Sequence, residues 1–179
     1  SLLRWLGLHV ALLIVASTGL CGLRAHGAPL AVCATVGMVA DLARGVGGPE
    51  VVVEGLMGPG VDPHLYKATS SDLIRLQRAE VILYGGLHLE GKMQETFQRL
   101  ARSGRRVRAV TDGLPPERLI RVGQDGMVDP HVWFDVELWS RCTERVAEEF
   151  AAARPDSAVG FRQRAATVKQ ELKDLHQWV

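Results

Sequence analysis

Apolar residues gather in four short runs along the first two thirds of the chain. These runs cover residues 30–36, 51–53, 81–84 and 105–110, and the last is the least apolar. After the first run, Met38, Leu42 and Val46 recur at a spacing of four, which is typical of one face of an α-helix. Strands that alternate with helices predict an α/β fold, with a four-stranded parallel sheet flanked by helices.

Two further patterns mark helices between the later runs. Thr69 is followed three residues later by Asp72, a spacing at which side chains can satisfy the free amide groups of a first helical turn. We expect Leu73, Leu76 and Ala79 to form the apolar stripe of that helix. Another helix is predicted across residues 91–102.

The last quarter of the chain predicts two more helices. Asp135 is a candidate N-cap, and the helix that it opens ends before Pro155. From Asp156 onward a long helix is expected, and its apolar residues share one face: Phe161, Ala165, Val168, Leu172, Leu175 and Val179. No Gly, Asn or Pro stops this pattern, so we expect the helix to continue in protein absent from this chain and to need a partner surface.

The first residues predict a secretory leader. The stretch 2–22 is almost wholly apolar with Arg4 near its start, and small residues follow, so residues 1–27 fit a leader cleaved before Ala28. Lipidation of Cys21 and an uncleaved membrane anchor are the alternatives. All three place the rest of the chain in a periplasmic or other extracytoplasmic compartment. The predicted division is therefore a leader at 1–27, a lobe at 28–154 and a long helix from 155 to 179.

Composition narrows the function classes. The 179 residues are 47% hydrophobic and 23% charged with a net charge of +1, so there is no basic excess to suggest nucleic acid as a partner. Cys33 lies in an apolar strand and Cys142 on an apolar helix face, where packing as small hydrophobic residues is the default expectation. No pair of cysteines has the spacing of a thiolate metal site.

The triplet Asp-Pro-His occurs twice, at 62–64 and at 129–131. Each copy lies in a polar or Gly/Pro-rich loop, the first after predicted strand two and the second after predicted strand four. Because the carboxyl ends of parallel strands meet at one edge of a sheet, we expect His64 and His131 to lie close together. The rigid proline suits a metal ligand, and each Asp could accept a backbone amide or orient an imidazole. A single copy would more simply be a turn with a solvated histidine.

Two imidazoles do not complete a metal site. Zinc and its neighbours need four or more ligands. His88 also follows a strand, but packing or helix-start capping is its expected role, and Glu54, Glu90 and Asp112 have no distinguishing context. We therefore expect the missing ligands to come from protein not present in this chain. Val132, Trp133 and Phe134 would keep water away from the second copy.

Three motifs together resemble a known family. The stretches 55–66, 82–90 and 129–135 look like the first-ligand loop, the third strand with its turn, and the second-ligand motif of the TroA-like (cluster A-I) solute-binding proteins, the metal receptors of bacterial manganese and zinc ABC importers. The resemblance runs from about residue 31 to the end. It implies that His64 and His131 are metal ligands of the N-terminal lobe of a two-lobe protein, and that residues from about 156 begin the helix that joins the lobes.

The resemblance implies a receptor that captures manganese or zinc, with iron as a third candidate, and delivers it to a membrane permease. A second lobe would carry two more ligands, so this chain would hold half a site. A surface adhesin with the same fold is one alternative. A zinc hydrolase is a weaker one, because no HExxH, GxSxG or nucleophile–base pair is visible.

Overall fold

The computed structural model describes residues 27–178. The predicted leader, Cys21 included, lies outside the described residues except for Gly27, as does Val179. None of the helices within 27–178 combines the length and the apolarity that crossing a bilayer requires.

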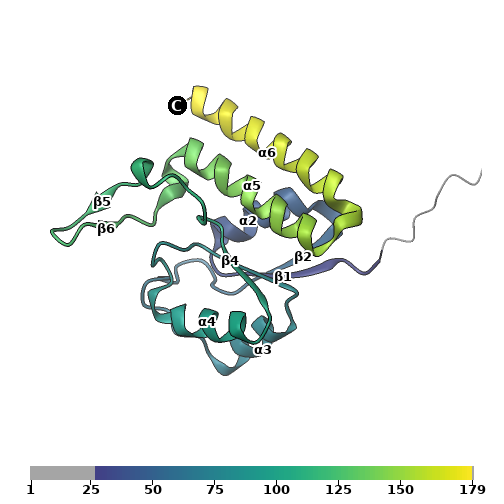
Figure 1. The fold of residues 1–179 in the computed structure, drawn as a ribbon, viewed down its shortest axis with the longest axis horizontal. Coiled ribbons are helices and arrows are strands. Elements are labelled where there is room, and N and C mark those ends of the chain that lie inside the picture. The colour runs from purple at the N-terminus through teal and green to yellow at the C-terminus, as the bar shows by residue number, and fades with distance from the viewer. Residues whose placement is uncertain (1–26, 179) are drawn as a thin grey trace, which may run out of the picture.

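A four-stranded parallel sheet forms the centre of the molecule (Figure 1). Its strands are β1 (Leu30–Ala34), β2 (Val51–Gly55), β3 (Val81–Tyr84) and β4 (Arg106–Ala109). They lie in the order β2-β1-β3-β4, so the chain steps to one side of β1 and then crosses to the other. This confirms the predicted fold class and all four predicted strands.

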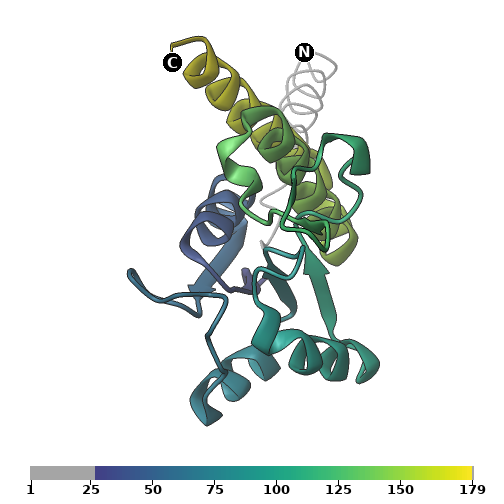
Figure 2. The same cartoon turned by 90° about the vertical axis from the view of Figure 1, so that its left-hand side faces the viewer.

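Helices cover both faces of the sheet. Figures 1 and 2 show α2 (Gly37–Gly47), α5 (Val136–Ala153) and α6 (Ala158–Trp178) on one face, and α3 (Ser70–Arg78) and α4 (Gln94–Arg102) on the other. Short 3-10 turns join several elements; they are Gly48–Glu50, Gly91–Met93, Pro116–Arg118, Val132–Phe134 and Pro155–Ser157. The capping box predicted for α3 is present, because Thr69 and Asp72 each bind the other's backbone amide.

The core lies on both faces of the sheet: Leu76 and Phe97 are buried on the side of α3 and α4, and the other part lies under α2, α5 and α6. Phe150 of α5 and Phe161 of α6 are fully buried, and their ring centroids lie 5.5 Å apart in an edge-to-face contact. Cys33 and Cys142 are free and buried, and burial raises the pKa of each thiol to about 12. They pack as hydrophobic residues, as the sequence predicts.

Some apolar positions are more exposed than their pattern predicts. Val52 of β2 is 61% exposed because β2 is an edge strand with only one covered face. Leu73 is 40% exposed, although Leu76 and Ala79 on the same predicted stripe are buried. In α6 the stripe is buried at its start and half-exposed by Leu175, because the early turns pack against α2 and α5.

The polar loop predicted before the second Asp-Pro-His contains a small antiparallel hairpin instead. Its strands are β5 (Arg121–Val122) and β6 (Met127–Val128). His131 therefore comes after β4, as predicted, but an exposed hairpin that was not predicted lies between them. The hairpin was missed because its strands are two residues long and its apolar side chains, including Met127, are exposed.

Glu90 has a structural role that its sequence context did not reveal. Its side chain is fully buried and accepts hydrogen bonds from Thr35 Oγ1 at 2.6 Å, from the Gly85 amide at 2.7 Å and from the Gly86 amide at 3.2 Å. Gly86 has a φ of 89°, which only glycine adopts easily. Glu90 thus joins the loops that follow β1 and β3 at the edge where strands end.

Candidate metal centre

The two Asp-Pro-His loops meet at one place. The first follows β2, the second follows the hairpin, and the Nε2 atoms of His64 and His131 lie 3.4 Å apart. Their ring centroids are 5.4 Å apart and the rings are tilted by 61°. The structure therefore brings together two histidines separated by 67 positions, as the repeated motif predicts.

The first loop is anchored on either side of His64. The Asp62 carboxylate accepts the His64 backbone N–H at 2.9 Å, which makes a tight turn around Pro63. Two residues after His64, the Tyr66 hydroxyl donates to the buried Asp72 carboxylate at 2.7 Å. Burial opposes ionisation of Asp72, but hydrogen bonds from Thr69 and Tyr66 outweigh it and hold the pKa below its ordinary value.

The second loop holds its histidine more tightly. Asp129 Oδ1 accepts the backbone N–H of His131 at 3.0 Å and also contacts the ring Nδ1 at 2.6 Å. The backbone N–H of His131, and then its ring, lower the pKa of the Asp129 carboxyl. The edge of Trp133 packs against the His131 ring at a centroid distance of 5.2 Å.

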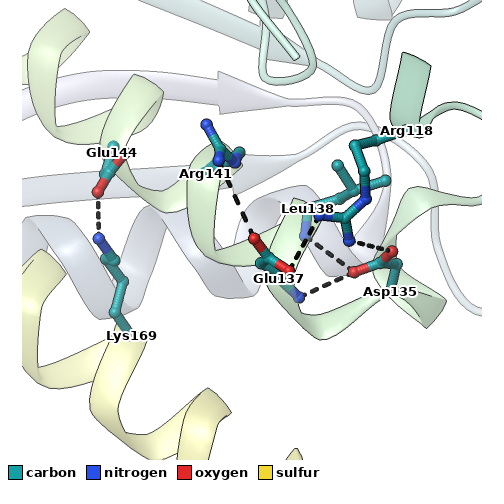
Figure 3. Close-up of polar contacts among 7 residues, drawn as sticks. All are labelled: Arg118, Asp135, Glu137, Leu138, Arg141, Glu144 and Lys169. Carbon is teal, nitrogen blue, oxygen red and sulfur yellow. Dashed lines mark hydrogen bonds and ion pairs between the residues drawn. The ribbon is translucent and has the colours of Figure 1, made fainter. Parts of the chain in front are cut away.

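Helix α5 fixes the far end of the second loop (Figure 3). Asp135 Oδ1 accepts the amides of Glu137 and Leu138 and so caps the helix, as predicted. Arg118, from before the hairpin, donates to Asp135 at 3.3 Å and to Glu137 at 3.0 Å, which ties both ends of the hairpin segment to α5. Further along, Glu144 pairs with Lys169 of α6.

The separation of the two Nε2 atoms suits a shared metal ion. Two imidazole nitrogens bound at about 2.0–2.1 Å to a tetrahedral ion lie about 3.3–3.4 Å apart. The 3.4 Å separation of the Nε2 atoms of His64 and His131 matches that distance. Imidazole binds zinc, iron and related divalent ions, so the pair alone admits several cargoes.

The other candidate side chains considered in the sequence do not join the pair. Among residues 27–178 there is no group of three or more His, Cys, Asp or Glu side chains able to hold a metal ion. His88 is exposed with a φ of 65° and is no part of the pair, and Glu54 is ion-paired with Arg75. Val132 is buried and Trp133 partly so, but Phe134 is 82% exposed and does not shield the site as predicted.

The fold, with two histidines paired beside the sheet, is that of one lobe of the solute-receptor class. Residues 32–179 match the family model ZnuA, described as zinc-uptake complex component A, periplasmic, and the chain belongs to this family. The resemblance seen in the sequence is thereby confirmed.

Three relatives show the range of the family. The chain is 43% identical over 149 residues to the manganese-binding lipoprotein MntA of Bacillus subtilis, covering 83% of this chain and 48% of the relative. It is 44% identical over 155 residues to the zinc-binding protein TroA of Treponema pallidum, covering 87% and 49%. It is 26% identical over 151 residues to the iron ABC transporter substrate-binding lipoprotein MtsA of Streptococcus pyogenes, covering 82% and 49%. The chain thus spans about half the length of each of these relatives.

A solved structure confirms the lobe architecture. The periplasmic zinc-binding protein TroA from Treponema pallidum superposes with a TM-score of 0.78 at 43% identity, covering 85% of this chain and 54% of that one. The relatives' names describe manganese, zinc or iron binding, in agreement with the predicted cargoes. All three names describe binding proteins, which agrees with the predicted receptor and not with the alternative of a zinc hydrolase.

Proposed function

We propose that this protein is an extracytoplasmic receptor that captures a divalent transition metal ion and delivers it to the membrane permease of an ABC importer. His64 and His131 are the metal ligands contributed by this chain. The observation that carries the proposal is the 3.4 Å separation of their Nε2 atoms, at the junction of two matching loops. Membership of the ZnuA family supports the same assignment.

The described residues hold half of the metal site in this proposal. Two imidazoles leave a tetrahedral ion with two open positions. The other ligands come from outside residues 27–178, since no third ligand lies beside the pair within them. Residues 28–154 are then the metal-binding lobe, and 155–179 belong to the helix that joins it to a second lobe. Manganese, zinc and iron remain the candidate cargoes, because ligands outside this lobe would choose among them.

The membrane enters this proposal in two ways. The permease is the receiving partner, and the predicted leader, or a lipid on Cys21, would keep the receptor close to it. Two of the relatives named above are lipoproteins, which supports the lipid anchor. Gene neighbours encoding an ATPase and a permease would favour the importer over a surface adhesin.

Calorimetric titration of the purified protein with Zn²⁺ tests the ligand assignment. We expect one weakly bound, exchangeable ion per chain, and binding at least ~100-fold weaker when both His64→Ala and His131→Ala are present. His176→Ala is the matched control, because His176 is exposed on α6 and should leave binding unchanged. Tight binding of one ion that survived both ligand substitutions would overturn the proposal.

A further inference from the structure

The two aspartates of the repeated motif do different things. Asp62 contacts only the backbone N–H of His64, at 2.9 Å. Asp129 contacts the backbone N–H of His131 and also its ring Nδ1, with the ring contact at 2.6 Å. Within residues 27–178, Nδ1 of His64 has no hydrogen-bond partner. The same triplet therefore fixes one imidazole ring and leaves the other ring without a carboxylate contact.

The contact with Asp129 decides where the proton of His131 lies. An ionised carboxylate can only accept hydrogen bonds, so Nδ1 of His131 must carry the proton. A neutral imidazole has a single N–H, and Nε2 of His131 is then a free lone pair aimed at His64.

We propose that Asp129 is a positioning residue that presets His131 for metal binding, and that Asp62 gives the ring of His64 no such support. The proposal rests on the function proposed above, because it takes the two histidines as ligands. His131 presents its Nε2 lone pair in a fixed orientation, whereas Asp62 holds only the backbone of His64 and not its ring.

Nitrogen NMR of the protein with ¹⁵N-labelled histidine tests the proposal directly. At about pH 8, where a free imidazole is neutral, the metal-free protein should show His131 protonated on Nδ1. Added Zn²⁺ should leave His131 in this form. Metal-free His131 protonated mainly on Nε2 would overturn the proposal.

A matched pair of variants isolates the ring contact. Asp62→Ala and Asp129→Ala each remove one bond to a backbone amide, but only Asp129→Ala also frees an imidazole. Loss of such an orienting carboxylate typically weakens metal binding about 10- to 100-fold, so we expect that loss for Asp129→Ala and less than about threefold for Asp62→Ala. Equal effects, or a His131 tautomer unchanged in Asp129→Ala, would overturn the role of Asp129.

The role of Asp129 and metal binding by the two histidines can fail separately. The tautomers of the metal-free, unsubstituted protein decide the role of Asp129 without any metal or variant. If Zn²⁺ binds at both histidines but the two aspartate variants behave alike, the receptor function stands and the preset ligand does not. If Zn²⁺ binds at neither histidine, the receptor function itself fails.

Discussion

The two Asp-Pro-His loops share a tripeptide but not an environment. In the first, His64 is exposed, and the loop is anchored at its backbone and through Tyr66. In the second, His131 is partly buried, its ring is held by Asp129, and Trp133 packs against its face. A repeated motif can therefore supply two imidazoles of which one is held in a fixed orientation and the other is not.

The chain segments on the C-terminal side of the two triplets explain this inequality. His64 lies within a turn that ends at Leu65, and four residues of irregular backbone then lead to α3. After His131 a 3-10 turn leads at once into the capped N-terminus of α5, which is a rigid part of the core. A ligand beside a helix start is fixed by the helix, whereas a ligand in mid-loop depends on side-chain anchors.

Single substitutions of the ligands should show the largest difference between the loops. His131→Ala removes the preset ligand, and His64→Ala removes the adjustable one. We expect His64→Ala to retain roughly three- to tenfold tighter Zn²⁺ binding than His131→Ala, because an oriented imidazole binds without reorganisation. Competition with a zinc-responsive dye measures both. Weaker binding by His64→Ala than by His131→Ala would contradict the comparison.

The substitution Tyr66→Phe should loosen the first loop only. It removes the hydroxyl that donates to Asp72 at 2.7 Å, so the protein should lose about 1 kcal/mol of unfolding free energy in urea melts at neutral pH. Zn²⁺ affinity should fall a few-fold through His64, while the His131 ring signals stay where they are. A shift of the His131 tautomer in Tyr66→Phe would show that the loops are not independent.

The pH dependence of stability should also report the hydrogen bond between Tyr66 and Asp72. Because its pKa is lowered on folding, ionised Asp72 stabilises the protein above its ordinary pKa of about 3.9, and this stabilisation is lost as pH falls through the lower folded value. Tyr66→Phe should raise that folded pKa. The variant should therefore lose less stability than the parent protein between neutral pH and about pH 3. An identical acid dependence of the two melts would contradict the anchor.

The smallest effect is expected at Arg118. Its bonds to Asp135 and Glu137 tie the hairpin segment to α5, but all three side chains are exposed to solvent. Exposed ion pairs contribute little, so Arg118→Ala should weaken Zn²⁺ binding by less than about threefold, with more of the loss at low salt. Arg141→Ala, which removes only the long contact to Glu137 at 4.0 Å, is the control. A tenfold loss would mean that the hairpin segment positions His131 as strongly as Asp129 does.

The sequence predicted the helices and strands better than the exposure and the contacts of individual side chains. The four strands, the cap at Asp135 and the closeness of His64 and His131 all followed from local patterns and from the geometry of parallel sheets. The hairpin at 121–128 and the exposure of Phe134 did not, because neither has a periodic signal. Glu90 resembled any other acidic residue in the sequence, since its three donors come from distant or backbone groups.

The contrast between Asp62 and Asp129 was also beyond the sequence. Identical triplets predict identical turns, and both backbone bonds do form. Whether a carboxylate also reaches a ring depends on the rotamers of both side chains, and Trp133 packs against the His131 ring alone of the two. Only the assembled structure contains that information.

X-ray absorption at the zinc edge, on protein loaded with one equivalent of Zn²⁺, tests the central claim that His64 and His131 share one ion. We predict a first shell of nitrogen and oxygen at about 2.0–2.1 Å with the outer-shell scattering of two imidazoles. His64→Ala should reduce this to one imidazole. A spectrum of the unsubstituted protein with one imidazole or none would contradict the shared site.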